Sequence, residues 1–417
     1  MVAEPGRRRT ILSLASVTRH GRAWFNSARV SRRWFLTSGA LALIVLNLVL
    51  LQGLYRAGAW ILYPNGGPIL IDFTPMWLAG GEALAGHAPS TYDSRYFDDV
   101  ETAFVGPHGG RYPWPYPPIF FLPAALLALL PYAWAFVAWQ AATLAGCLAA
   151  GYRILRDGLT PLVILASPLT VLNAYVGQNG FLTAALIGGG LVSLERWPLA
   201  AGLCFGCLFY KSQFLPLFPV LFAISGRWRA LGAMIAAGAL LAIASALAFG
   251  TETWLAFPAA LIQRAQGALV VQDLPWGKLQ SVYALARSLG LGALIAGIVH
   301  ALVALPIAGL SCLMWRRSTS FDLKAASAAI AALIVTPYLL AYDMAAIVIP
   351  GAFLVKDLVE RGGTRAERAA VFLLFCALFV MFAGNGIMPL GPVVNLLLFS
   401  LIARRAFSQW ARLRLRS

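Results

Sequence analysis

Residues 35–55, FLTSGALALIVLNLVLLQGLY, form an uninterrupted run without a charged side chain. A helix of about 20 apolar residues is long enough to cross the hydrocarbon core of a bilayer. Similar runs recur along the whole chain, which has 417 residues, of which 60% are hydrophobic and 12% charged. Soluble domains carry about twice that charged fraction. The sequence therefore predicts an all-α integral membrane protein with no soluble domain.

The apolar runs predict a bundle of about twelve transmembrane helices. Several runs are shorter than a full membrane crossing, so we expect tilted or broken helices packed inside the bundle. A further piece, 119–130, is expected to dip into the membrane from the outer side. The predicted spans lie near 35–55, 132–152, 159–175, 181–194, 198–210, 213–225, 230–250, 291–315, 325–342, 344–356, 369–384 and 392–403.

The flanks of this membrane domain, 35–403, are basic. Residues 1–34 lead directly into the first span with no small-residue cleavage site followed by a soluble chain, so they predict a cytoplasmic tail rather than a cleaved signal. Residues 404–417 predict a second basic cytoplasmic tail. Between the first two spans, 56–131 predicts a long first outer loop.

The net charge of +16 is explained by membrane topology. With both ends in the cytoplasm, the inner segments hold 25 of the 32 Lys and Arg residues, and the outer segments hold seven. This asymmetry follows the positive-inside rule. It explains the positive charge without a nucleic-acid partner. We expect a multi-pass protein of the bacterial plasma (inner) membrane.

Polar residues collect on the predicted outer side. The first loop contains LIDFTPMWLAGGEALAGHAPSTYD (70–93) and YPWPYPP (112–118), and later outer turns contain YVGQNG (175–180), YKSQF (210–214) and TPYLLAYD (336–343). Ionisable groups at a membrane boundary are costly unless they are paired or hydrated, which makes them functional candidates. A carboxylate can accept a hydroxyl proton, cations can neutralise a phosphate, and aromatic rings can stack on a sugar.

Motifs for metals or nucleotides are missing from the sequence. Asp98-Asp99 is adjacent rather than spaced as Asp-x-Asp, and it is typical of a solvated loop. Cys204-x-x-Cys207 lies in an apolar run, where buried thiols are a simpler interpretation than a redox pair. We therefore expect neither a metal nor another cofactor.

An ordered series of motifs resembles glycosyltransferase family 87, whose members are integral membrane enzymes of the GT-C type. The series comprises DFTPMWLAGGEALAGHAPSTYD (72–93), Tyr-Pro-Pro (116–118), VGQNGFLTAALI (176–187) and a lysine after a Gly-rich span, Lys211. The resemblance covers about residues 70–230 and weakens afterwards. Where many members have a His-containing motif, this chain has Tyr342-Asp343, which leaves its sugar and acceptor preferences open.

The resemblance implies a GT-C helical bundle and an extracytoplasmic active site. The best-understood members transfer mannose from a polyprenyl-phosphate donor, so it implies this donor and a glycolipid, glycan or protein acceptor. Asp72 matches the catalytic base, and Lys211 with Arg264 would bind the donor phosphate. The remaining candidates for substrate binding are Trp77, Glu82, Tyr92, Asp93, Tyr116, Gln178, Asn179, Gln213, Tyr338 and Asp343.

Structural roles compete with these assignments. Asp72 could cap the helix that Asp-Phe-Thr-Pro begins, and Lys211 could reach lipid head groups. Head groups could equally satisfy Arg264 and Lys278, and Asp343 has apolar neighbours that favour an internal bond. For the whole protein, the alternatives to a transferase are a transporter or flippase for lipid-linked sugars and a non-catalytic component of envelope polysaccharide assembly.

Overall fold

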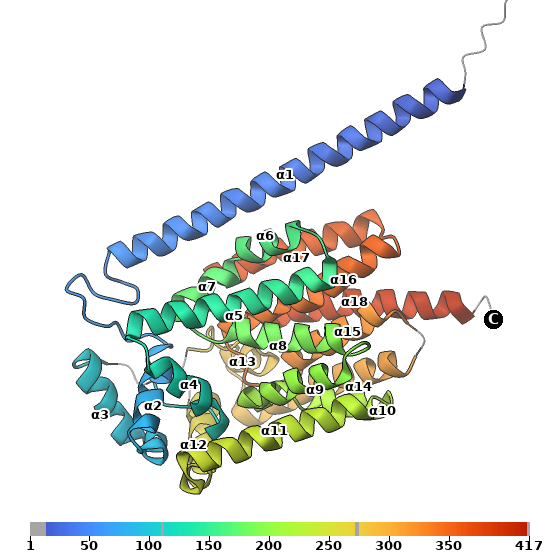
Figure 1. Cartoon of the computed structure of the whole chain (residues 1–417). Helices are drawn as coiled ribbons and strands as arrows, with labels where there is room; N and C mark the ends of the chain where they lie inside the picture. Colours follow the sequence, from blue (N-terminus) through green and yellow to red (C-terminus); the bar gives the residue numbers. More distant parts are fainter. Residues whose placement is uncertain (1–13, 110–111, 272–274, 318, 415–417) are drawn as a thin grey trace, which may run out of the picture.

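The structure is a computed structural model that describes residues 14–109, 112–271, 275–317 and 319–414. Within these ranges the chain is almost entirely helical, and the only β-structure is a few isolated bridges. The helices run roughly side by side in one bundle, with a cap of short helices at one end (Figure 1).

The long helices of the bundle lie on the apolar runs of the sequence. Reversals between them fall where polar or Gly-Pro segments interrupt those runs, because such residues favour turns. The bundle helices are α1 (Leu14–Arg56), α5 (Tyr132–Leu155), α6 (Leu159–Ala166), α7 (Pro168–Val176), α8 (Gly180–Ser193), α9 (Pro198–Cys207), α10 (Leu217–Ile224), α11 (Trp228–Phe249), α14 (Ala293–Arg316), α15 (Phe321–Val335), α16 (Val348–Glu360), α17 (Arg365–Ala383) and α18 (Gly391–Arg414).

Shorter helices form the cap and the breaks in the bundle. The cap contains α2 (Thr74–Leu84), η1 (Ala88–Tyr92), α3 (Ser94–Val105), η2 (Pro118–Phe120), α4 (Phe121–Ala128), α12 (Thr251–Gln266), η4 (Gly267–Val271) and α13 (Val282–Ser288). Two breaks, η3 (Leu208–Phe214) and η5 (Ala341–Ile347), interrupt otherwise apolar stretches.

Five described helices are long and apolar enough to cross a membrane alone: Arg33–Arg56 of α1, α5, α11, α14 and α17. The α6–α7 pair, bent by 61°, makes a sixth if it counts as one span. This confirms the all-α fold and is compatible with a membrane protein. The remaining bundle helices are shorter, so the count of twelve crossings stays a prediction. Segment 119–130 is mostly helical, as η2 and α4.

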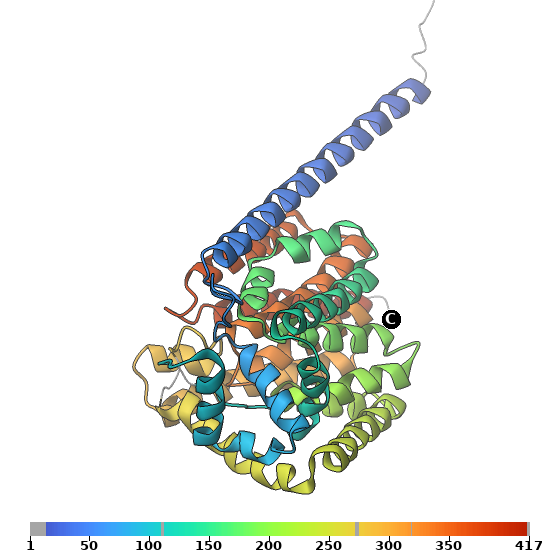
Figure 2. The same cartoon turned by 60° about the vertical axis from the view of Figure 1, so that its left-hand side comes forward.

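Contacts between distant segments define the two ends of the bundle. At one end, Arg33 and Asp157 form an ion pair at 2.9 Å, and Arg227 and Glu195 form another at 3.4 Å. At the other end, the indole nitrogen of Trp60 donates to the carbonyl of Tyr175 at 2.9 Å, and Gln280 donates its amide N–H to Leu339. The predicted inner turns thus share one end and the predicted outer turns share the other (Figures 1 and 2).

Helix α1 projects beyond the bundle at its N-terminal half (Figure 2). Its apolar part is mostly exposed, apart from a few residues that face α6. Asn47 is 8% exposed and donates its side-chain amide to the carbonyl of Leu165 at 3.0 Å. Because α6 ends at Ala166 and the N–H of Leu169, the regular donor to this carbonyl, bonds the Ser167 hydroxyl instead, the carbonyl lies at a break in the helix and is free to accept from Asn47.

Small residues let α9 and α11 approach closely. A Cβ atom on Gly202 would lie 2.4 Å from the Cβ of Ala233, and one on Gly206 would lie 2.4 Å from the Cβ of Ala237. This is the small-xxx-small packing that membrane helices use in place of hydrophobic association. The neighbouring Cys204 and Cys207 are free thiols, but they are half-buried rather than fully buried.

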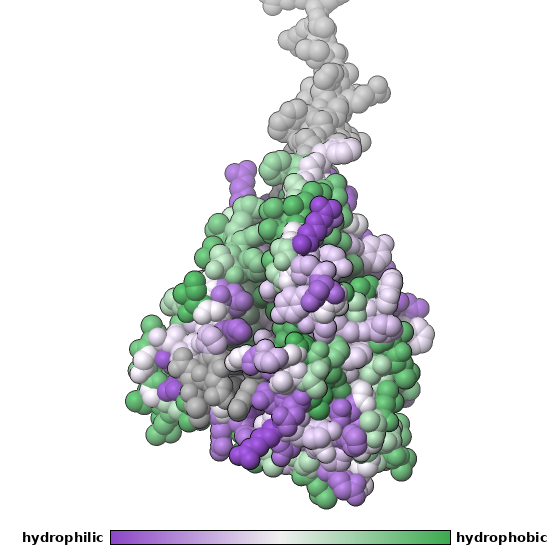
Figure 3. Space-filling model, turned by 90° about the vertical axis from the view of Figure 1, so that its left-hand side faces the viewer, coloured by the Kyte–Doolittle hydropathy of each residue, from purple (hydrophilic) through white to green (hydrophobic). Residues whose placement is uncertain are grey.

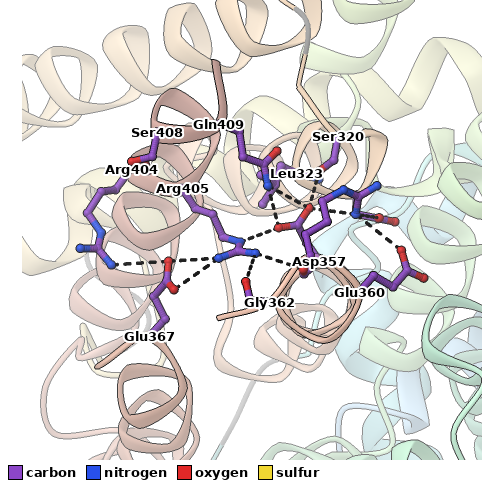
Figure 4. A network of polar contacts seen from close by, with 12 residues as sticks. Ser320, Leu323, Asp357, Glu360, Gly362, Glu367, Arg404, Arg405, Ser408 and Gln409 are labelled. Atoms are coloured by element: carbon purple, nitrogen blue, oxygen red, sulfur yellow. Dashed lines mark hydrogen bonds and ion pairs between the residues drawn. The ribbon is translucent and has the colours of Figure 1, made fainter. Parts of the chain in front are cut away.

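Buried charges tie α15, α16, α17 and α18 together at the basic end (Figure 4). Asp357 is fully buried and accepts hydrogen bonds from Arg405 at 2.5 Å, Ser320 at 2.5 Å and Gln409 at 3.0 Å. Arg405 also contacts Glu367 at 3.2 Å. The carboxylates and the guanidinium therefore satisfy one another inside an otherwise apolar bundle.

Replacing Asp357 with Ala should lower the melting temperature of the detergent-solubilised protein by several degrees. Removing one partner of a buried ion pair typically costs 3–5 kcal/mol, because the other charge stays buried and uncompensated. Glu360→Ala is the matched control, since its carboxylate is half-exposed and its ion pairs, at 3.5 and 3.9 Å, lie at the surface. Equal melting temperatures for the two variants would contradict this role of Asp357.

Candidate functional site

Asp72 lies in the turn that leads into α2. The N-cap of α2 is Phe73, and no side chain caps the helix, so Asp72 does not have the capping role that the sequence allowed. Thr74 fixes the turn instead. Its hydroxyl accepts the amide N–H of Ile71 at 3.0 Å and lies 2.9 Å from the hydroxyl of Tyr132. The Asp72 carboxylate therefore takes no part in capping α2.

Phe73 anchors the same turn in the bundle. Its ring is fully buried and packs against Tyr132 and Phe136, with ring centroids 5.7 and 5.3 Å apart. Gly177, which has φ +75°, lies directly against it, since a Cβ there would be 2.6 Å from the Cβ of Phe73. The α7–α8 turn and the Asp72 turn are therefore in contact.

A chain of hydrogen bonds connects Asp72 to the cap. The hydroxyl of Tyr116 donates to Gln178 Oε1 at 2.9 Å and accepts from Asn179 Nδ2 at 2.8 Å. The side-chain nitrogen of Gln178 lies 3.5 Å from the backbone carbonyl oxygen of Asp72. The Gln178 side chain also hydrogen-bonds the carboxyl group of Asp72. Tyr92 holds the backbone of Tyr116, donating its hydroxyl to the Tyr116 carbonyl at 2.7 Å.

Two buried amides hold the 177–180 turn in place. Gln140 and Asn173 both donate to the carbonyl of Gln178, at 3.1 and 3.0 Å. Asn173 also accepts the amide N–H of Gly180 at 2.9 Å. The polar turn is therefore satisfied from inside the bundle, and the Gln178 side chain is free to face Tyr116 and Asp72.

Lys211 and Asp343 form a buried ion pair beside this turn. Their side chains are 4% and 0% exposed, and the lysine ammonium donates to Asp343 Oδ1. The ammonium also lies 4.7 Å from the centre of the Tyr342 ring. The second oxygen of Asp343 accepts the amide N–H of Leu340 at 3.3 Å. The broken helices η3 and η5 bring these residues together from positions far apart in the chain.

Three cations act on Asp72. Burial raises the pKa of Asp72 to about 6, and this is opposed by the charges of Lys278 and Arg264, the hydrogen bond from Gln178 and the charge of Lys211. Asp72 is therefore largely ionised at pH 7 and is a stronger base than an exposed aspartate. Arg264 also hydrogen-bonds the hydroxyl of Tyr338.

Figure 3 looks onto this end of the molecule. Hydrophilic residues lie across its central part, whereas hydrophobic residues occupy much of its sides. A separate cavity of about 300 Å³ lies at the opposite, basic end, lined by residues that include Arg227, Trp315 and Lys324. The group around Asp72 is therefore separated from that cavity by the length of the bundle.

Other predicted site residues have contacts within the cap. The indole nitrogen of Trp77 donates to the carbonyl of Leu130 at 2.9 Å, and its ring packs on Phe104. Asp93 is the N-cap of α3, accepting the amide N–H of Arg95 at 2.8 Å. These interactions give both residues structural roles.

Glu82 and Gln213 also lie apart from the hydrogen-bond chain. Glu82 accepts the hydroxyl of Tyr96 at 2.5 Å and lies 3.2 Å from a ring nitrogen of His87. Gln213 is half-buried on η3, two residues after Lys211. The two residues keep their predicted binding roles only as hypotheses.

Two residues near Asp72 were missing from the predicted set. Among the charges that lower the pKa of Asp72, that of Lys278 has the largest effect. In the sequence, however, Lys278 resembles any lysine at a membrane interface. Tyr342 faces the ammonium of Lys211. The structure shows that the segment before Lys278 packs tightly, because a Cβ on Gly277 would lie 2.4 Å from the backbone of Gly386.

The family model of glycosyltransferase family 87 matches residues 114–341, more than half of the chain. The chain belongs to glycosyltransferase family 87. Membership makes the protein a membrane glycosyltransferase with a sugar donor and an acceptor, which decides against the transporter and scaffold alternatives. The match includes Tyr116, Gln178 and Lys211, whereas Asp72 lies 42 residues before its start and Asp343 two residues after its end. Neither a curated protein nor a solved structure matches the chain.

Gly177→Ala should disturb the Asp72 turn of this family 87 enzyme. The new methyl group would collide with Phe73 and Phe136, and the positive φ would be strained in any L-residue. We expect a melting temperature lower by several degrees and a clear loss of sugar transfer. Gly297→Ala on α14 is the control, since nothing lies within 4 Å of its Cβ position. Matching behaviour of the two variants would argue against the contact.

Proposed function

We propose that this family 87 enzyme transfers a sugar, with mannose as the first candidate, from a polyprenyl-phosphate donor to an acceptor hydroxyl on the extracytoplasmic side. The observation that carries the proposal is Asp72. Among the described residues no cation forms an ion pair with it, yet three cations and the Tyr116–Gln178 pair surround it.

Asp72 is assigned as the general base. Proton transfer by a positioned side chain typically contributes 10²–10⁴ in rate, and a base with a pKa just below the working pH is well suited to it. As the acceptor hydroxyl attacks the anomeric carbon, its proton passes to the Asp72 carboxylate. The bond from the anomeric carbon to the phosphate oxygen breaks, and the lipid phosphate leaves with the electron pair.

Lys278 and Arg264 are assigned to the donor phosphate. Both cations act on Asp72 from the cap, where a lipid-borne phosphate would approach. Fixed positive charges beside a departing phosphate stabilise the negative charge that grows on it. Lys211 is compensated by Asp343 and is 4% exposed, so it would reach a phosphate only by leaving that partner.

The transfer is proposed to invert the anomeric centre. A retaining double displacement would need a second carboxylate as nucleophile, about 5–5.5 Å from the acid/base by analogy with retaining glycoside hydrolases. The other carboxylate of this group, Asp343, is held by Lys211 and by the backbone of Leu340. Direct attack with Asp72 as the base therefore agrees best with the side chains at hand.

The membrane orientation belongs to the same proposal. The end of the bundle that contains Asp72 carries few Lys and Arg residues, whereas the opposite end carries most of them. By the positive-inside rule the Asp72 end is extracytoplasmic. With twelve crossings in a bacterial inner membrane, both termini are cytoplasmic, and the donor is carried by lipid because nucleotide sugars stay in the cytoplasm.

Asp72→Asn should lower kcat for sugar transfer by about 10²–10⁴ while the protein stays folded. The measurement is transfer from a polyprenyl-phosphate sugar by purified enzyme in nanodiscs. In the wild type, kcat/KM should fall about tenfold for each pH unit below about 6, because the raised pKa of Asp72 leaves the base protonated there. Glu252→Gln, an exposed carboxylate on the first turn of α12, is the control. Near-normal turnover by Asp72→Asn would refute the assignment.

Lys278→Gln and Arg264→Gln should each raise the KM for the donor by about one to two orders of magnitude, with a smaller effect on the KM for the acceptor. The reason is the loss of a charge-assisted contact to phosphate, worth about 1.5–3 kcal/mol. Arg95→Gln on α3, which removes an exposed cation at the same end, is the matched control. Equal changes for donor and acceptor would count against phosphate binding.

A further inference from the structure

A second group of chemically active side chains lies on the cap, around α3. Asp98 and Glu101 are three residues apart on this helix and therefore share one face. The helix ends at Gly106, which has φ +86°, and the chain turns back so that His108 faces the same two carboxylates. One ligand atom from each of the three residues lies within 4.8 Å of the other two.

Glu101 is the unusual member of this group. Its side chain is 1% exposed. Oε2 accepts the amide N–H of Tyr112 at 3.3 Å, but Oε1 is buried without a hydrogen-bond partner in the part of the chain that the structure describes. A buried carboxylate oxygen without a partner is costly, and it therefore needs a proton or a cation.

We propose that Asp98, Glu101 and His108 bind a divalent transition-metal cation, Zn²⁺ or Mn²⁺. Two carboxylates and one imidazole are ligands of this class, whereas Mg²⁺ and Ca²⁺ prefer oxygen ligands alone. Bonds of about 2.1 Å to each ligand need ligand atoms within about 4 Å of one another, so small side-chain rotations close the site. Water would complete the coordination.

The cation would act on the active site through the backbone. Glu101 holds the amide of Tyr112, and Tyr112 lies within electrostatic reach of both Glu101 and Asp72. Four residues further on, Tyr116 donates to Gln178 beside Asp72. A metal at α3 would therefore position the Tyr112–Tyr116 segment without touching the substrate. Only this consequence rests on the proposed function, while the metal site itself does not.

The site is not encoded as a recognisable motif. The spacing of 98, 101 and 108 matches no standard metal signature, and Asp98-Asp99 alone predicts a solvated loop. Of the two neighbouring aspartates, Asp98 is half-buried and faces Glu101, whereas Asp99 is exposed and outside the group. This difference supplies a matched pair for the experiment.

The test is metal binding by the full-length enzyme, purified without a polyhistidine tag and stripped with chelator. Calorimetric titration with Zn²⁺ and with Mn²⁺ should give about one site per chain for at least one of the two metals. Asp98→Asn, Glu101→Gln and His108→Ala should each weaken it at least tenfold, with Asp99→Asn unchanged. The metal should also raise the melting temperature of the wild type and of Asp99→Asn only.

Two results would overturn the proposal. The first is that the wild type binds neither metal and Glu101→Gln is as stable as the wild type. The partner of Glu101 Oε1 would then be a proton, since burial raises the pKa of Glu101 to about 8. The other is equal binding by Asp98→Asn and Asp99→Asn. Both readouts need no substrate, so they are independent of whether Asp72 is the base or the donor is a lipid phosphate.

Discussion

The buried ion pair between Lys211 and Asp343 joins the two broken helical segments on which the candidate site is built. Both partners lie among apolar helices, where neither charge could stay alone, so each fixes the position of the other. Their pairing holds η3 against η5 and places Tyr342 over the ammonium. Because Gly180 lies against the backbone of Tyr342, the 177–180 turn and the Gln178 side chain depend on the same pair.

The sequence predicted the positions of the helices well. Apolar runs and their polar interruptions are local features, and the bundle helices from α5 to α11 and from α14 to α17 follow them closely. The cap helices α2, α3, α12 and α13 lie between the predicted spans and were not predicted. The number of membrane crossings could not be predicted in the same way. Helices α8, α9, α10 and α16 are shorter than a bilayer is thick, so their packing and the surrounding lipid determine whether they cross it. The breaks at η3 and η5 were visible as polar residues, Lys211 and Asp343, within apolar stretches.

The site was predictable in part. Asp72, Tyr116, Gln178 and Asn179 come from three separate stretches of the sequence and do lie together, connected by hydrogen bonds. Side-chain direction cannot be read from the sequence, so the contact of Trp77 with Leu130 was not predicted, whereas an ordering role for Asp93 agrees with its position just after Tyr92. Family 87 membership follows from residues 114–341. The burial of Glu101 comes from tertiary packing alone, and so the α3 cluster had no signal in the sequence.

The hydrogen bond from Asn47 to the carbonyl of Leu165 has a consequence for biosynthesis. The two residues are 118 positions apart, so α1 leaves the ribosome and enters the bilayer long before its partner exists. At elongation rates of about 5–20 residues per second, about 6–24 seconds pass between the synthesis of Asn47 and that of Leu165. Until Asp157 and helices α6 and α7 are synthesised, α1 lacks the partners that it contacts in the folded protein.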